Sequence, residues 1–239
     1  MIKQIKELMN KFTSNSNEYS FKYGFKHIVG YRYTVCENFC FVMIGANDGK
    51  SMDPIYEFLS NSDVSGLVVE PLPDIFERLK DNYQHIDKIK CVNRAVHSSR
   101  KKMTIYRVDP ALKDIPEWMH GIGSFDPMHY KKSGTPKEYI LEEEVNCSTF
   151  MDLLSEYDIT KIDLLKIDVE GYDYEVLKMI DFKKIKPEII RYEHGSLSKT
   201  DKTSAERLLT INGYSILVEG NDTSAMLDNE PGWVFDCKK

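Results

Sequence analysis

Several features that mark specialised classes of protein are scarce in this sequence. Its 239 residues hold only five cysteines, and no two of them form a Cys-x-x-Cys pair. Cys36 and Cys40 lie four residues apart, but no second pair of cysteines or histidines completes a zinc site. The other three are Cys91, Cys147 and Cys237. An odd number of widely spaced cysteines excludes a disulfide scaffold, so we expect free thiols in a reducing cytoplasm.

The sequence also lacks long apolar runs and an excess of basic residues. No run approaches the roughly 18 apolar residues of a membrane span, and the N-terminal MIKQIKELMNKF has no continuous apolar stretch like that of a secretory signal. Lysine and arginine total 32 against 38 acidic residues, a formal net charge of −6. Nucleic-acid surfaces need clustered positive charge. These absences predict a cytoplasmic protein with no membrane span and no nucleic-acid partner.

What is present is the composition of a globular protein, with 41% hydrophobic and 29% charged residues. At roughly 100–200 residues per domain, the length fits one full domain with a short appendage. Residues 2–12 repeat apolar side chains at helical spacing, and the polar stretch 13–20 breaks this pattern. We therefore predict an N-terminal helical arm over residues 1–37 and a single domain over 38–239. We expect the arm's helix to pack either on the core or on a partner subunit. In the second case the protein forms a homo-oligomer through this helix.

From residue 39 onwards, strand and helix patterns alternate. The apolar run FCFVMI (39–44) ends at a glycine, as expected of a strand buried on both faces. The alternation predicts an α/β fold, a parallel sheet with helices on both faces that binds ligands at the carboxyl ends of its strands. Residues 108–144 are predicted as an irregular insertion, and 220–231 as a loop before a short antiparallel strand at 233–235. Further strands are predicted at 65–69, 88–93, 102–107, 162–168, 188–193 and 214–219, and helices at 54–60, 73–82, 149–157, 173–180 and 201–211.

The sharpest local motif is the turn Gly45-Ala46-Asn47-Asp48-Gly49, directly after the first strand. Glycine lets the backbone turn tightly and approach a ligand closely. Glu70 follows the second strand, where a carboxylate can accept hydrogen bonds from both ribose hydroxyls of an adenosine ligand. Turn and acid together indicate a nucleoside cofactor. The alternative is that Glu70 only caps the helix that begins at Pro73.

The residues of this turn favour one kind of nucleoside cofactor. A dinucleotide site needs Gly-x-Gly-x-x-Gly, but Asn47 replaces the middle glycine and Asp48 adds negative charge where a pyrophosphate would lie. That charge suits a ligand that carries an ammonium and a sulfonium group. S-adenosylmethionine is therefore favoured over a nicotinamide dinucleotide, and a methyltransferase over an oxidoreductase.

Two further polar groups follow later strands. Asp168 ends the strand 162–168, where its carboxylate could orient the methionine ammonium, take a proton from an acceptor or bind a divalent cation. Glu193 and His194 reach the same edge after the strand 188–193. Because histidine titrates near neutrality, we expect His194 or Asp168 to act as a base, with Glu193 orienting the histidine. A divalent metal on these three residues is a weaker alternative, and a purely structural histidine stays open.

Taken in order, these motifs resemble those of the FkbM family of S-adenosylmethionine-dependent methyltransferases. The resemblance covers residues 39–228 and leaves out the N-terminal arm. It rests on Ile44–Gly49 (IGANDG), Asp53-Pro54, Glu70–Pro73 (EPLP), Gly123-Ser124-Phe125, Leu165–Asp173 (LKIDVEGYD) and Glu193-His194.

The resemblance implies a class I methyltransferase fold, which is a Rossmann-like three-layer sandwich. Its sheet is mostly parallel and seven-stranded, with a C-terminal antiparallel strand. Met43 stands where the family often has Asp or Gln, so Asp168 could supply the polar contact to the cofactor's amino-acid end instead. The glycine turn would pass the methionine part, Glu70 would hold the ribose, and Asn93 and Ala95 would lie by the adenine. The expected cofactor site as a whole is Gly45, Asn47, Asp48, Gly49, Glu70, Pro71, Asn93, Ala95, Ser124 and Asp168.

The resemblance also implies the reaction, methylation of a hydroxyl on a sugar, a glycan or a small natural product. Aromatic residues in and near the insertion could stack on such an acceptor, or could simply pack over the sheet. They are Tyr106, Trp118, His120, His129 and Tyr130. The alternative from another class is a protein that keeps the methyltransferase fold without catalysis and serves as a partner in a biosynthetic assembly.

Overall fold

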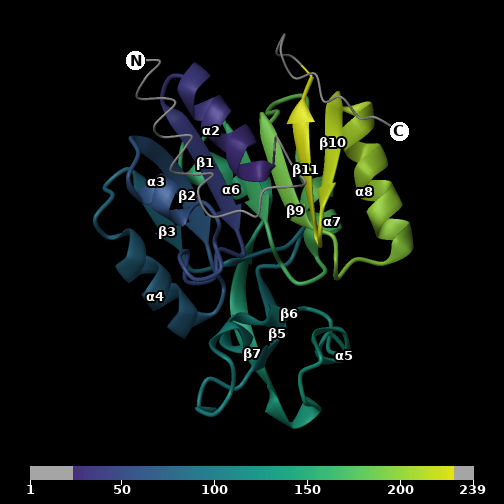
Figure 1. The fold of residues 1–239 in the computed structure, drawn as a ribbon. Helices are drawn as coiled ribbons and strands as arrows, with labels where there is room; N and C mark the ends of the chain where they lie inside the picture. The colour runs from purple at the N-terminus through teal and green to yellow at the C-terminus, as the bar shows by residue number, and fades with distance from the viewer. Residues whose placement is uncertain (1–23, 229–239) are drawn as a thin grey trace.

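The computed structural model describes residues 24–228, in which a seven-stranded sheet meets a smaller sheet at its carboxyl edge (Figure 1). The strand order of the large sheet is β10-β11-β9-β8-β1-β2-β3. The five strands from β9 to β3 are parallel, and β11 runs antiparallel to both of its neighbours. This is the mostly parallel sheet that the alternation predicts. Its strands are β1 Phe39–Ile44, β2 Val64–Val69, β3 Ile89–Val92, β8 Leu164–Ile167, β9 Ile189–Glu193, β10 Tyr214–Glu219 and β11 Asp222–Leu227.

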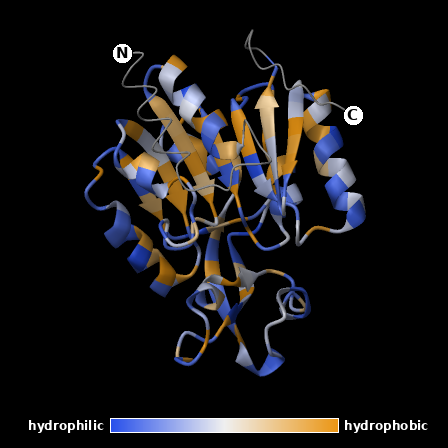
Figure 2. Cartoon of the chain, in the orientation of Figure 1, coloured by the Kyte–Doolittle hydropathy of each residue, from blue (hydrophilic) through white to orange (hydrophobic). Residues whose placement is uncertain are grey.

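Helices cover both faces of the large sheet and complete the predicted three-layer sandwich. Helices α2 (Phe25–Val35), α3 (Tyr56–Ser60) and α4 (Pro73–Tyr83) pack on the face that includes Phe41 and Met43. The other face, with Val42 and Ile44, is covered by α6 (Phe150–Glu156), α7 (Asp173–Lys178) and α8 (Lys199–Ile211). All of β1 is buried, because alternate side chains point to opposite covered faces. Figure 2 shows the resulting apolar centre of the sheet.

The sequence pattern does not predict helix α2. Its segment FKHIVGYRYTV contains a glycine and several aromatic and β-branched residues, which have low helix propensity. Tertiary contacts stabilise the helix instead. Phe25, Ile28 and Val29 are buried against the sheet, and the Arg32 guanidinium pairs with the buried Asp163 carboxylate at 2.9 Å. The helix predicted at 2–12 lies outside the described residues.

A four-stranded sheet with the order β4-β7-β5-β6 lies against the carboxyl edge of the large sheet (Figure 1). The predicted insertion 108–144 is therefore not irregular throughout, since β7 begins at Ile140 and pairs antiparallel with β5. The polar sequence of β7, ILEEEVNCS, does not show the pattern of a buried strand because only Val145 and Cys147 of its nine residues are buried. We call residues 97–148 the cap. The strands are β4 Ala95–Val96, β5 Lys102–Val108, β6 Gly123–Ser124 and β7 Ile140–Ser148, with short helices η1 Glu117–Gly121, α5 Tyr130–Ser133 and η2 Lys137–Tyr139.

The antiparallel strand of the large sheet comes earlier than predicted. The segment 220–231, expected to be a loop, contains β11, which forms a tight hairpin with β10. Its sequence, DTSAML, looks loop-like because three of its residues are polar, yet two of these are buried and have hydrogen-bonding partners. Ser224 accepts a hydrogen bond from Arg191 at 3.0 Å, and Thr223 lies 2.9 Å from the ring of His194. The strand predicted at 233–235 lies outside the described residues.

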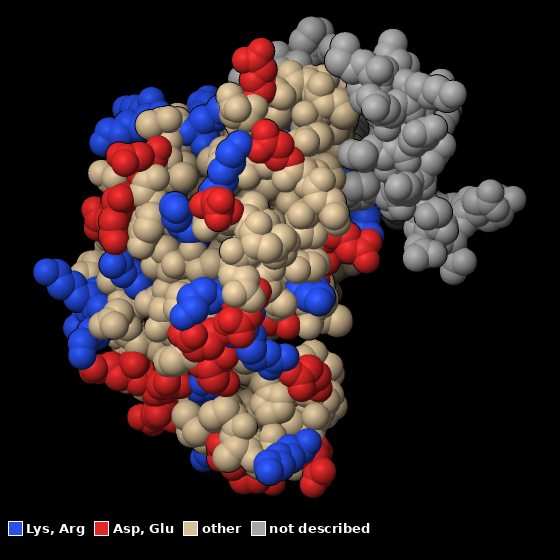
Figure 3. All heavy atoms as spheres, turned by 90° about the vertical axis from the view of Figure 1, so that its left-hand side faces the viewer, with Lys and Arg blue, Asp and Glu red and all other residues tan. Residues whose placement is uncertain are grey.

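The described residues contain no helix that could span a membrane, and the face shown in Figure 3 carries charges of both signs. The longest described helix, α8, has 13 residues. None of the described helices combines the length and the apolar character needed to cross a membrane. On the face in Figure 3, basic and acidic side chains are interspersed.

Candidate active site

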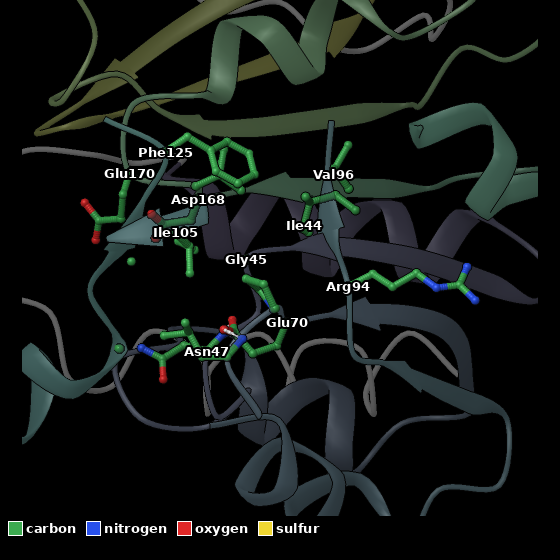
Figure 4. A pocket seen from close by; sticks show the side chains of 16 residues that line it. Ile44, Gly45, Asn47, Glu70, Arg94, Val96, Ile105, Phe125, Asp168 and Glu170 are labelled. Atoms are coloured by element: carbon green, nitrogen blue, oxygen red, sulfur yellow. Dashed lines mark hydrogen bonds between the residues drawn. The ribbon is translucent and has the colours of Figure 1, made fainter. Parts of the chain in front are cut away.

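A pocket of about 660 Å³ opens between the carboxyl ends of the central strands and the cap (Figure 4). Its walls come from the ends of β1, β2, β3 and β8 together with the cap's β5 and the segment 121–125. Parallel strands bring their carboxyl ends to one edge, so loops far apart in sequence meet there. Six of the ten residues predicted to bind the cofactor line this pocket: Gly45, Asn47, Glu70, Pro71, Ala95 and Asp168.

Gly45 allows the chain to leave β1 in the required direction. Its φ of +73° lies in the left-handed region, and an added Cβ would lie 1.8 Å from the carbonyl oxygen of Asp168. Glycine alone therefore lets the loops after β1 and β8 come this close. The amides of Gly45 and Ala46 both donate to the carbonyl of Val69 at 3.0 Å, which ties the turn to the end of β2.

Glu70 joins the loops that follow β1 and β2. Its carboxylate is buried, with Oε2 accepting the N–H of Asn47 at 2.9 Å and Oε1 accepting that of Leu72 at 3.0 Å. Burial raises the pKa of Glu70 to about 7, although these hydrogen bonds and the charge of Arg107 act in the opposite direction. Leu72 is the N-cap residue of α4, so the bond from its N–H also ties Glu70 to the start of this helix. Each carboxylate oxygen has a second lone pair, which leaves acceptor capacity for the hydroxyls of a ligand.

Asp168 follows β8, and its side chain is exposed to the pocket. Within residues 24–228 its carboxylate accepts no hydrogen bond, and the nearby Lys166 ammonium pairs instead with Asp53 at 3.1 Å. The surrounding protein desolvates the carboxyl at the bottom of the pocket, which raises the pKa of Asp168 to about 7; Lys166 opposes the rise, and neighbouring carboxylates, chiefly that of Glu170, add to it. At neutral pH this carboxyl can therefore both accept and release a proton.

Two other predicted cofactor residues brace the pocket from behind. The Asn93 side-chain amide donates to the carbonyls of Glu70 and Pro71 at 2.9 and 3.0 Å. The Ser124 hydroxyl donates to the carbonyl of Glu170 at 2.8 Å, which connects the cap to the loop after β8. Both side chains hold the backbone of lining residues in place, and neither lines the pocket itself.

Asp48 and Gly49 shape the loop after β1 and lie outside the pocket lining. The Asp48 carboxylate accepts the amide N–H groups of Lys50 and Ser51 at 2.9 and 2.7 Å, so it is engaged within its own loop. Gly49 packs under the ring of Tyr83, where an added Cβ would lie 2.4 Å from a ring carbon. The structure therefore gives these two predicted residues a role in the loop, not in the pocket wall.

Glu193 and His194 end β9, but neither lines the pocket. The Nδ1 atom of His194 lies 2.9 Å from the hydroxyl of Thr223, and the Glu193 carboxylate accepts the N–H of Ser196 at 3.1 Å. Thr223, not Glu193, therefore orients the histidine. No group of three His, Cys, Asp or Glu side chains within residues 24–228 could hold a metal ion, so Asp168, Glu193 and His194 do not form a shared set of ligands.

The cap supplies pocket residues, and the sequence motifs indicate only Gly123 and Phe125 among them. Ile105, Gly121 and Phe125 line the pocket opposite the sheet edge. The buried His129 places Nε2 2.9 Å from the carboxylate of Glu170, which lines the pocket wall. The Gly123-Ser124-Phe125 segment is the only signal in the sequence that points to this part of the site. The remaining cap residues reach it only through the docking of the second sheet.

Comparisons with known proteins agree with this arrangement. The family model described as the methyltransferase FkbM domain matches residues 44–216. A search of curated proteins finds no match. Similar solved structures include precorrin-6y C5,15-methyltransferase from Geobacter metallireducens, which is 12% identical with a TM-score of 0.44 and covers 88% of this chain and 93% of that one. Human methyltransferase 10 domain containing protein is 12% identical with a TM-score of 0.42, covering 94% and 80%.

The N-terminal domain of human METTL16, solved in complex with SAH, is 13% identical with a TM-score of 0.39 and covers 94% of this chain and 68% of that one. These likenesses are remote, whereas the family model spans well over half of the chain. Its match runs from the end of β1 to β10 and includes the glycine turn, Glu70 and Asp168. The chain therefore belongs to the FkbM family of S-adenosylmethionine-dependent methyltransferases.

Proposed function

We propose that this methyltransferase methylates a hydroxyl oxygen of a sugar, a glycan or a small natural product. The observation that carries the proposal is the Asp168 carboxylate. It faces the pocket, accepts no hydrogen bond from the described residues, and has a pKa raised to about 7. A hydroxyl acceptor must lose its proton during the reaction, and a base is most effective when its pKa lies near the working pH.

The pocket residues fit the cofactor of the family. Glu70 retains lone pairs for the two ribose hydroxyls, Gly45 and Asn47 would border the methionine part, and Ala95 would lie by the adenine. S-adenosylmethionine, when bound, supplies a methyl group on a positively charged sulfur. Carboxylates around the pocket complement that charge. Met43 is buried in the core and makes no contact there.

Bound S-adenosylmethionine would give up its methyl group to the acceptor oxygen, its sulfur would keep the electron pair of the broken sulfur–methyl bond as neutral S-adenosylhomocysteine, and Asp168 would accept the proton of the acceptor hydroxyl. The sheet edge and the cap hold the acceptor in line, and such positioning can contribute about 7–11 kcal/mol to lowering the barrier. His129 keeps the carboxylate of Glu170 in the pocket wall. Phe125 and Ile105 line the opposite side and reduce access of water to the reacting oxygen.

Calorimetric titration with S-adenosylmethionine, S-adenosylhomocysteine and NAD tests the cofactor site. Glu70→Ala should weaken binding of the first two by about ten- to 150-fold, since losing hydrogen bonds to a charged group costs about 1.5–3 kcal/mol. Glu77→Ala is the matched control. Glu77 is an exposed glutamate on α4, the helix that follows Glu70, and the variant should bind like the wild type. Binding of NAD alone would contradict the proposal. Cofactor binding without turnover on any hydroxyl acceptor would favour the non-catalytic partner.

The affinity for S-adenosylmethionine should increase as the pH rises from 6 to 8. In the free protein the pKa values of Glu70 and Asp168 are both raised to about 7, and the ribose hydroxyls and the cofactor's positive charge favour the ionised forms. Binding therefore releases protons, and affinity is lost as the pH falls through 7, by about tenfold per carboxyl between pH 8 and pH 6. Calorimetry in buffers of different ionisation enthalpy measures the release. Glu70→Gln should remove one of the two contributions, and a pH-independent wild type would contradict the assignment.

A further inference from the structure

A second recess, of about 640 Å³, lies beside the cofactor pocket between the loop after β1, helix α4 and helix η1 of the cap. It shares Asn47 and Gly121 with the cofactor pocket, so the two spaces adjoin at these residues. We call it the Trp118 recess, after the η1 side chain in its wall. No role in cofactor binding is assigned above to the other residues that line this recess.

Two large apolar side chains are exposed in this recess. Trp118 is 51% exposed and Met52 is 85% exposed, and both line it. Exposed apolar surface that is gathered beside a pocket and rimmed by polar groups marks a binding surface. The backbone of Met52 has a φ of +63°, which is rare for a residue other than glycine, and it holds this side chain outward from the loop.

Polar groups surround the apolar platform. Arg78 of α4 pairs with the Glu117 carboxylate of η1, and the same guanidinium nitrogen lies 3.8 Å from the Asp48 carboxylate. The other guanidinium nitrogens and the second oxygen of Glu117 make no hydrogen bond within the described part of the chain. Although burial opposes it, hydrogen bonds from Ser51 and the loop amides lower the pKa of Asp48. The recess therefore carries two carboxylates and one guanidinium, a net negative charge.

We propose that the Trp118 recess binds a neutral sugar ring of the methyl acceptor, a proposal that rests on the function proposed above. A pyranose ring has an apolar face of C–H groups, which matches the indole and the thioether. Its rim of hydroxyls both donates and accepts, which matches the second carboxylate oxygen of Glu117 and the remaining guanidinium nitrogens of Arg78.

Other occupants fit this recess less well. A flat aromatic acceptor would cover the indole but leave the charged groups desolvated without partners, which is unfavourable. A phosphorylated or uronic sugar would meet a net negative charge. Asn47 and Gly121 line both spaces, so a ring held in the recess lies next to the cofactor pocket.

Fluorescence of Trp118 reports whether the recess is filled. Trp233 is the only other tryptophan in the chain, so the variant Trp233→Phe isolates the signal of Trp118. Acrylamide quenching would be measured with methyl glycosides of glucose, mannose, galactose and rhamnose, with and without saturating S-adenosylhomocysteine. A ring that covers the half-exposed indole should lower the quenching constant about twofold. Glucuronate, glucose 6-phosphate and catechol are the anionic and flat aromatic comparisons, and should protect less.

Variants show whether the protection comes from this recess. In saturation-transfer NMR with the best glycoside, Trp118→Phe should keep the signal and Trp118→Ala should lose it, while Arg78→Met should weaken it. Affinity for S-adenosylhomocysteine, measured by calorimetry, shows that each variant is folded and tests the cofactor site separately. No protection by any neutral glycoside, protection by catechol alone, or equal protection by anionic sugars would overturn the proposal. If the wild type does not bind S-adenosylhomocysteine, that result would contradict the proposed function instead.

Discussion

Asp168→Asn should lower the rate of methyl transfer by about 10²–10⁴-fold, because it replaces the proposed base with a group of the same shape that cannot take a proton. The affinity for S-adenosylhomocysteine should change far less, since the ribose contact lies at Glu70 and the backbone of the glycine turn is untouched. Product formed in single turnover, with the best acceptor of a hydroxyl panel, measures the effect.

The pH profile separates Asp168 from the other titrating carboxyl. At saturating cofactor, the wild-type rate should fall at acidic pH because Asp168 acts only when ionised, and the fall should begin below pH 7, since the cofactor's positive charge lowers the pKa of Asp168 from its value of about 7 in the free protein. Asp168→Asn should remove this pH dependence of the rate. The comparison variant is His194→Ala, which should keep most of the turnover because His194 contacts Thr223 and does not line the pocket. A large loss in His194→Ala together with an active Asp168→Asn would transfer the role of base to the histidine.

Gly45→Ala should destabilise the protein by about 3 kcal/mol or more and weaken cofactor binding by about 100-fold or more. Part of the stability cost is the left-handed φ of +73°, which a Cβ disfavours. The larger part is steric, because the new Cβ would lie 1.8 Å from the Asp168 carbonyl oxygen and would drive apart the ends of β1 and β8. Urea unfolding and calorimetry measure the two effects.

Gly134→Ala is a control for the backbone contribution alone. Gly134 has a φ of +71°, almost the same as that of Gly45, but an added Cβ there would meet no atom within 4 Å. Its substitution should cost about 1 kcal/mol and leave cofactor affinity unchanged. If both alanine variants lose the same stability, the close approach of the two loops does not constrain the site.

Much of the cofactor site follows from local sequence, because the pattern of buried strands places their carboxyl ends at one edge. The run 39–44 predicts β1, and the turn after it, Glu70 and Asp168 then share that edge by topology alone. The prediction of a loop over 220–231 is wrong because DTSAML is polar, and its polar groups find partners on β9, on β10 and in the loop after β9.

By itself, the sequence determined the α/β class, the family and six of the residues that line the pocket at the carboxyl edge of the sheet. These depend on periodicity and on spacing within single strand-and-turn units, where neighbours in sequence are neighbours in space. Only the tertiary structure decided that Asp168 lies in the pocket while His194 pairs with Thr223, and that Trp118 faces a recess beside it. The physical reason is that these contacts join segments far apart in the chain, so they depend on how the cap and β11 pack against the sheet and not on any local pattern.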